Sequence, residues 1–267
     1  MITIAVYNNK GGVGKTTSAI NLAACLASKQ NLCLLIDLDS QACVGDMLMG
    51  STDVSDAMAS QNGLKPLEAL LGGDFDPELN IAVTSFRHYD KKTKRYPELW
   101  LDVIPCTPEL AKHEFKSPWE LKDLLDKVRD KYDYCILDLP PAKSDAAYIG
   151  LLSCDYLITP CKADRFSASA INNVESIVEE VLDSNSTLRF LGAFINDFDT
   201  RYTVSKKLKE VYGQNTAIFF KSYVRRSSCF DIACLEGKPV LCYSGTTGAE
   251  DFMKVTEEMV RKIQGSR

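Results

Sequence analysis

The chain has 267 residues, of which 45% are hydrophobic and 25% are charged, and its formal net charge is −5. This composition is typical of a globular protein with a sizeable core, and it excludes a disordered chain, a collagen-like chain and a small disulfide-stabilised scaffold. No run approaches the roughly 18 consecutive apolar residues of a membrane-spanning helix, and the first residues lack the pattern of a signal peptide.

Short apolar runs alternate with amphipathic segments along the chain. Residues 2–7 are rich in β-branched side chains and predict a buried strand, and residues 16–29 carry apolar side chains at helical spacing. In chain order we expect further strands over 32–36, 101–104, 134–137, 156–159, 190–195 and 217–220. We expect further helices over 119–131, 167–182, 204–212 and 249–263.

This alternation predicts the α/β class, with a doubly wound, mostly parallel sheet flanked by helices on both faces. Continuously apolar strands fit a sheet that is covered on both sides. No linker or internal repeat divides the chain, so we expect one domain over residues 1–267. Two segments break the alternation. Residues 50–80 are irregular, and residues 87–96 form a basic, polar loop that is either solvated or a contact surface for a polyanion or a partner.

The strongest functional signal is the octapeptide KGGVGKTT at residues 10–17, between the first predicted strand and the first predicted helix. A glycine-rich turn in this position is typical of a phosphate-binding loop, because its backbone N–H groups and the positive end of the helix face the phosphate oxygens. Lys15 can reach the β- and γ-phosphates, and the Thr16 hydroxyl can bind Mg²⁺. The expected nucleotide contacts are Lys10, Gly11, Gly12, Val13, Gly14, Lys15, Thr16 and Thr17.

Aspartates follow two of the predicted strands. Asp37 and Asp39 come at the end of the strand over 32–36, and Asp138 ends the strand over 134–137. Ligands of open parallel sheets bind at the carboxyl ends of the strands. Because Mg²⁺ prefers an oxygen shell and keeps several waters, carboxylates that hold those waters suit it. We therefore expect Thr16, Asp37 and Asp138 to form the magnesium site.

Asn9, the residue before the octapeptide, stands where the usual pattern has its first glycine, and the octapeptide begins with Lys10. In this it resembles the deviant Walker A box of the MinD/ParA-type P-loop ATPases. The likeness covers nearly the whole chain and is greatest for the ParA branch. Residues 37–41 resemble its DxDPQ box with Ser40 in place of proline, residues 103–111 resemble its hIPxxxxLa segment, and residues 138–141 resemble its DxPP switch.

The resemblance assigns roles to individual residues. It implies that Lys10 crosses a dimer interface to the partner's nucleotide, and that Asp39 polarises the attacking water or couples the γ-phosphate to a switch loop. Lys10, Lys15 and Asp39 are therefore the expected catalytic residues. It also implies that adenine is contacted by Asn196 and by Val224 and Arg225, where the family usually has Pro-Arg.

The implied function is a slow ATPase switch in DNA partition. ATP and Mg²⁺ would stabilise a sandwich homodimer that binds DNA without sequence preference, and a ParB-like partner would stimulate hydrolysis and release. Such a protein is cytoplasmic and nucleoid-associated, with no membrane contact. Residues 201–267 contain 12 Lys/Arg and 7 Asp/Glu, so they are basic although the whole chain is acidic. Within them we expect Lys221, Arg225 and Arg226 to bind DNA phosphates.

Four alternatives stay open. A close variant positions a protein cargo instead of DNA, and a MinD-like ATPase would insert its C-terminal helix into a membrane surface. Residues 253–263 contain two glutamates and no aromatic residue, which indicates a helix packed on the sheet. An iron–sulfur ATPase like the nitrogenase iron protein needs paired cysteines, and none of the ten cysteines forms a CxxC pair, so reduced thiols are expected. ATP-dependent small-molecule ligases share the fold.

Overall fold

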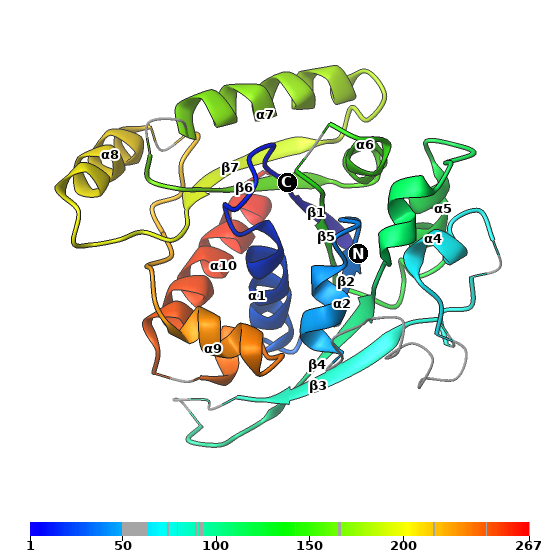
Figure 1. The fold of residues 1–267 in the computed structure, drawn as a ribbon, viewed down its shortest axis with the longest axis horizontal. Helices are drawn as coiled ribbons and strands as arrows, with labels where there is room; N and C mark the ends of the chain where they lie inside the picture. Colours follow the sequence, from blue (N-terminus) through cyan, green and yellow to red (C-terminus); the bar gives the residue numbers. More distant parts are fainter. Residues whose placement is uncertain are drawn as a thin grey trace.

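The computed structural model describes residues 1–49, 64–73, 75–78, 80–88, 90, 93–141, 143–164, 167–215, 217–243 and 245–266. Its centre is a seven-stranded sheet in the order β3-β4-β2-β5-β1-β6-β7 (Figure 1). All neighbouring strands are parallel except β3 and β4, which are antiparallel. The strands are β1 Ile2–Val6, β2 Cys33–Asp37, β3 Ala82–Arg87, β4 Glu98–Ile104, β5 Tyr134–Asp138, β6 Tyr156–Cys161 and β7 Arg189–Ile195.

Helices cover both faces of this sheet (Figure 1). The α-helices are α1 Lys15–Ala27, α2 Cys43–Leu48, α4 Leu67–Leu70, α5 Glu120–Asp126, α6 Asp145–Leu152, α7 Ser167–Leu182, α8 Thr203–Gln214, α9 Cys229–Leu235 and α10 Thr247–Gly265. Two 3₁₀ helices, η1 Pro108–Lys112 and η2 Val240–Cys242, accompany them. No described helix is long and apolar enough to cross a membrane.

Alternate residues of the strands build a core on each face. In β1, Ile4 and Val6 pack in the cluster that contains α1 and α10, whereas Ala5 packs in the cluster that contains α5, α6 and α7, together with Tyr7, the residue after the strand. Successive side chains of a strand point to opposite faces, so a strand that is buried on both sides must be apolar throughout. The predicted α/β class with a mostly parallel, doubly covered sheet is confirmed.

Two predicted elements were wrong in detail. The helix expected over 119–131 ends at Asp126, because the next backbone N–H groups bond three residues back, as from Lys127 to Leu124 at 3.2 Å. The expected strand over 217–220 is not a strand. Its backbone forms hydrogen bonds to β7 around one isolated bridge, which pairs Ala193 with Phe219. Gly192, with φ +118°, precedes Ala193 in β7.

Other elements were not expected from the sequence. These are the antiparallel strand β3 and the helices α2, α6 and α9. The hairpin from β3 to β4 contains the basic segment 87–96, of which residues 89, 91 and 92 lie outside the described part. Most of the segment predicted as irregular, 50–80, also lies outside it.

Candidate nucleotide-binding site

Parallel pairing brings the predicted phosphate loop and two aspartates to one edge of the sheet. Val6, the last residue of β1, is in register with Asp138 of β5, which is in register with Asp37 of β2. The loop over residues 7–14 leaves β1 at this edge and enters α1 at Lys15. Because these strands run in the same direction, residues that are more than a hundred positions apart meet at their carboxyl ends.

The loop conformation explains its glycines. Gly12 has φ +69° and Gly14, the residue before α1, has φ +85°. These left-handed values are strained for residues with a Cβ atom, so glycine is the residue that permits this bend. The bend brings successive backbone N–H groups to the start of α1, where the helix dipole adds a positive field. An anionic phosphate group fits this end of the helix.

Two asparagines hold the loop from either side. Asn8 donates its side-chain amide to the carbonyl of Pro160 at 2.8 Å, and its Oδ1 accepts the backbone N–H of Lys10 at 2.9 Å. Asn196, just after β7, donates from Nδ2 to the carbonyl of Val13 at 2.8 Å. The structure therefore places Asn196, the predicted adenine contact, directly against the phosphate loop.

The three aspartates differ in environment. Asp37 is fully buried and accepts the backbone N–H groups of Asp39 and Val44 at 3.0 and 3.1 Å. Its pKa is raised well above the usual value by burial and by the charge of Asp138. Asp39 is half-buried, and its side chain accepts the backbone N–H of Gln41 at 3.1 Å. Asp37 is thus part of the folded turn, while Asp39 lies on the rim.

Asp138 is buried without a hydrogen-bond partner of ordinary geometry in the described part of the chain, and this holds for both carboxylate oxygens. Burial raises its pKa to about 7, and the nearby Thr16 side chain and Lys15 ammonium oppose the rise. Lys15 is itself buried, and desolvation lowers its pKa although Asp138 and Asp39 favour its charge. The site thus contains a buried carboxylate with unused acceptor capacity beside a hydroxyl and an ammonium group.

These donors fit a magnesium ion. Mg²⁺ takes hard oxygen ligands, keeps several waters and is usually bound by one or two side chains together with substrate phosphates. The free oxygens of Asp138 and the hydroxyl of Thr16 are such donors, and Asp37 is adjacent in the sheet. No group of three or more His, Cys, Asp or Glu side chains among the described residues could hold a metal by itself. Phosphate oxygens and waters would therefore complete the shell.

Lys10 lies at the rim of the site in an ion pair with Asp164 that joins Nζ and Oδ2 at 2.6 Å. Asp164 follows β6, whose carboxyl end lies at the same edge of the sheet, and both side chains are about one-third exposed (36% and 32%). Sequence reasoning missed Asp164. Its position five residues after the strand predicted over 156–159 was the available signal.

The predicted adenine-side segment packs on the end of β7. Val224 is fully buried, receives a hydrogen bond from Phe198 at 2.9 Å and donates one to Ile195 at 2.8 Å. Arg225 forms a two-point ion pair with Asp251, with N–O distances of 2.7 Å, and this pairing raises the pKa of the guanidinium. Val224 therefore has a structural role whether or not its backbone faces a ligand.

The predicted DNA-binding residues are not equivalent. Lys221 is exposed, whereas Arg226 pairs with Asp197 through two hydrogen bonds of 2.8 Å and Arg225 is held by Asp251. Paired guanidinium groups carry less net field than isolated ones. Among the described residues, the structure therefore brings together the ammonium of Lys221, which has no ion pair there, and two paired guanidinium groups, not a cluster of three free cations.

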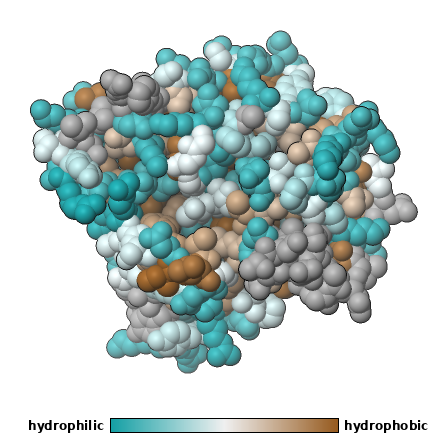
Figure 2. Space-filling model, viewed as in Figure 1, coloured by the Kyte–Doolittle hydropathy of each residue, from teal (hydrophilic) through white to brown (hydrophobic). Residues whose placement is uncertain are grey.

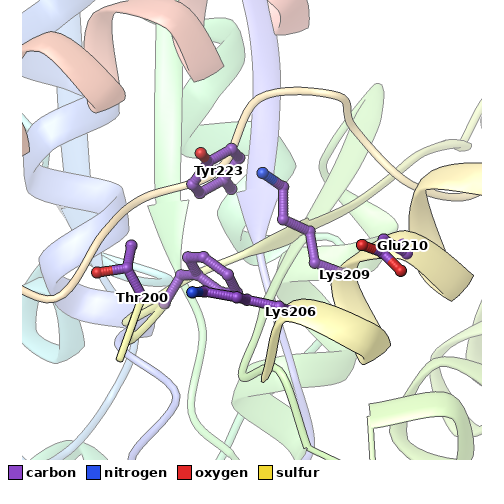
Figure 3. A pocket seen from close by; sticks show the side chains of 6 residues that line it. Thr200, Lys206, Lys209, Glu210 and Tyr223 are labelled. Carbon is purple, nitrogen blue, oxygen red and sulfur yellow. The ribbon is translucent and has the colours of Figure 1, made fainter. Parts of the chain in front are cut away.

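A separate cavity of about 340 Å³ lies between α8 and the segment before Val224. Phe198, Thr200, Lys206, Lys209, Glu210 and Tyr223 line it (Figure 3). The ammonium of Lys209 lies 3.5 Å from the ring centroid of Tyr223, a cation–π contact that holds this lysine at the cavity wall. None of these residues belongs to the phosphate loop.

The loop between the buried strand β1 and helix α1 contains glycines with left-handed backbone angles, and aspartates lie at the ends of adjacent parallel strands. This arrangement defines a P-loop nucleotide-binding protein. Comparison with known proteins gives the family. The AAA_31 family, described as an AAA domain, matches residues 1–190, and the chain belongs to it.

Similar proteins include partition ATPases. The chain is 27% identical to the chromosome partitioning protein ParA of Myxococcus xanthus, with 97% of this chain and 88% of ParA covered. It is 28% identical to the chromosome-partitioning ATPase Soj of Treponema pallidum, with 97% of each covered. A solved structure of Mycobacterium smegmatis cobyrinic acid a,c-diamide synthase, with bound ATP analogue and magnesium, superposes with a TM-score of 0.78 at 22% identity and covers 100% of this chain and 97% of that one. The resemblance to ParA-type ATPases is confirmed.

Proposed function

We propose that the chain is a ParA-type ATPase that uses ATP and Mg²⁺ to switch between a monomer and a DNA-binding sandwich homodimer in partition. The observation that supports this most directly is the pairing of the Gly12 and Gly14 bend with the unpartnered, buried oxygens of Asp138 at one sheet edge. Such a site provides a phosphate cradle and a place for a divalent cation. The partition proteins to which this chain is similar align with it over nearly their whole length, and this similarity supports the biological role.

The site residues have distinct proposed roles. The loop residues 10–17 bind the phosphates through backbone N–H groups, and Lys15 places its ammonium on the β- and γ-phosphates. Thr16, Asp37 and Asp138 hold the magnesium and its waters. Asp39, on the rim, orients the attacking water, and Lys10 reaches the nucleotide of the partner subunit.

Base recognition and DNA contact are proposed for the region after β7. Asn196 can contact adenine while it remains bonded to the loop, since its Oδ1 is available in addition to the Nδ2 bond to Val13. Val224 and Arg225 are proposed to line the same side. Lys221, together with Arg225 and Arg226, is proposed to contact DNA phosphates without reading sequence.

Partners follow from the same proposal. A ParB-like protein would stimulate ATP hydrolysis. The unstimulated rate would be slow, because the described site contributes positioning and charge neutralisation by two lysines. The dimer would be nucleoid-associated in the cytoplasm, and residues 1–267 would act as one domain. The variant in which the cargo is a protein uses the same switch.

DNA retention tests the proposal. The wild-type protein should bind a random-sequence DNA duplex more tightly with ATP and Mg²⁺ than with ADP, and sedimentation should show the dimer with ATP alone. Lys15→Ala should lose nucleotide binding and the ATP-dependent gain in DNA retention, while Lys10→Ala should bind ATP without forming the dimer. Lys131→Ala, which removes an exposed lysine elsewhere, should behave as wild type. Equal retention with ATP and ADP would refute the switch.

A further inference from the structure

The hairpin formed by β3 and β4 is an exposed, basic ribbon outside the proposed nucleotide site. Six residue pairs, from Ala82–Val103 to Arg87–Glu98, join the strands, and an isolated bridge between Asp90 and Arg95 extends them. β3 is the edge strand of the sheet, and the hairpin projects beyond α9 at the lower left of Figure 1. The sheet therefore ends in a two-stranded ribbon.

The two faces of this ribbon differ. Ala82, Leu99 and Leu101 face inward and are buried in the core. On the opposite face, Val83 and Trp100 are 57% and 56% exposed. The inner face anchors the hairpin by burying apolar area, so the outer face and the turn can contact a ligand without loss of the fold.

Positive charge is concentrated at the turn. Residues 87–96 contain five Lys/Arg and one Asp in a chain whose net charge is −5. Arg87, Lys94 and Arg95 are exposed, and no ion pair of these three occurs among the described residues. The lobe where the hairpin ends, at the lower left of Figure 2, is mainly hydrophilic. By contrast, Arg225 and Arg226 are held by carboxylates.

The ligand that fits this ribbon is double-stranded nucleic acid. The major groove of B-DNA admits a two-stranded β-ribbon, and exposed Lys and Arg side chains bind its phosphates with release of counterions. A bilayer surface fits less well. Insertion needs a group of bulky apolar side chains at the tip. Among the described residues, Tyr96 is the exposed aromatic side chain at the turn, and the exposed Val83 and Trp100 lie back along the strands. The charge pattern thus favours a polyanion bound from solution.

We propose that the β3–β4 hairpin is a second nucleic-acid contact, which binds duplex DNA through Arg87, Lys94 and Arg95 irrespective of bound nucleotide. The turn lies at the amino end of β4, whereas the phosphate loop lies at the carboxyl ends of the neighbouring parallel strands. A contact at the opposite end of the sheet does not depend on closure of the nucleotide site. This proposal does not rest on the ATP switch.

The test compares nucleotide-free wild-type protein with Lys94→Gln/Arg95→Gln on a random-sequence duplex, followed by anisotropy. Loss of two phosphate contacts should reduce the slope of log affinity against log salt by about 2. The affinity of the variant should then fall roughly tenfold less than that of wild type between about 50 and 200 mM salt. The matched control, Lys112→Gln/Lys116→Gln, removes two exposed lysines past the other end of β4 and should keep the wild-type slope.

Trp100 gives an independent readout. In a Trp119→Phe protein it is the only tryptophan, and duplex binding at the hairpin should change its emission. An unchanged salt slope in Lys94→Gln/Arg95→Gln, or equal losses in both double variants, would overturn the proposal. So would tight binding to vesicles containing anionic lipid with none to DNA. A Lys15→Ala protein should keep the hairpin effect, so failure of the ATP switch and failure of the hairpin contact are distinguishable.

Discussion

Replacement of Asp138 by asparagine should stabilise the nucleotide-free protein while it removes a proposed magnesium contact. The Asp138 carboxylate is buried, and neither oxygen has a hydrogen-bond partner of ordinary geometry among the described residues. Asp37 faces it in register on the neighbouring strand, so two carboxylates share one buried edge. A cation would neutralise this pair, and without it the charge is a cost to the folded state.

The size of this cost follows from the raised pKa. A rise from 3.8 to about 7 corresponds to on the order of 4 kcal/mol at a pH above both values. The unfolded state releases this proton more readily, so the cost is absent below the unfolded pKa, grows as the pH rises between the two values and levels off above the folded one. An asparagine amide without partners costs about 1–3 kcal/mol in turn. The net gain for Asp138→Asn should therefore be about 1–3 kcal/mol well above pH 7.

Urea unfolding of the nucleotide-free protein at about pH 5 and about pH 8 measures this difference. The advantage of Asp138→Asn should grow by on the order of 2–3 kcal/mol between the two conditions. Asp130→Asn, which changes an exposed aspartate, is the control and should show little change. If Asp138→Asn and wild type differ equally at both pH values, the reasoning from a buried unpaired charge is refuted. In the same assay, addition of Mg²⁺ with ATP should stabilise the wild-type protein against urea and should not stabilise Asp138→Asn.

Three further substitutions test separate features. Asp164→Asn removes the ion pair to Lys10, which at this exposure is worth about 0.2–1 kcal/mol. The ATP-dependent dimer should therefore tighten up to about fivefold, as measured by sedimentation. An unchanged dimer dissociation constant would contradict this. Gly192→Ala places a Cβ 2.2 Å from the Ile218 carbonyl oxygen at φ +118° and should cost about 2 kcal/mol or more in urea unfolding, whereas Gly213→Ala, in open space, should not destabilise. Gly14→Ala, at φ +85° and 2.3 Å from Asn196 Nδ2, should weaken binding of a fluorescent ATP analogue at least tenfold or so, and wild-type affinity would count against the loop assignment.

The parts of the fold that were predicted correctly rest on local, repeated patterns. The strands β1, β2, β5, β6 and β7 are mostly apolar and buried, and α10 has apolar positions at helical spacing, so their existence was evident. The phosphate loop was evident because its glycines are needed for backbone reasons that do not depend on distant residues. The edge hairpin was not, since β3 alternates exposed and buried residues and neighbours a polar turn.

The distribution of free charge was less predictable. Sequence identifies Arg225 and Arg226 as adjacent cations, but their partners, Asp251 and Asp197, are 26 and 29 residues away and meet them only through tertiary packing. The same holds for Lys10, whose partner Asp164 is 154 residues away. Ion pairing of this range depends on the sheet order, which periodicity does not specify.

Asn196 lies beside the phosphate loop and makes a contact there that the sequence did not indicate. A polar residue at the end of β7 was expected to face the ligand, and the end of β7 does reach the phosphate loop. Yet its amide donates to the carbonyl of Val13, and the space around Gly14 is so narrow that an added Cβ would lie 2.3 Å from that amide. A residue that both supports the loop and faces the base would couple loop geometry to nucleotide identity. Asn196→Ala would then weaken both ATP and inorganic triphosphate, and ATP by the larger factor, whereas a base contact alone would leave triphosphate binding unchanged.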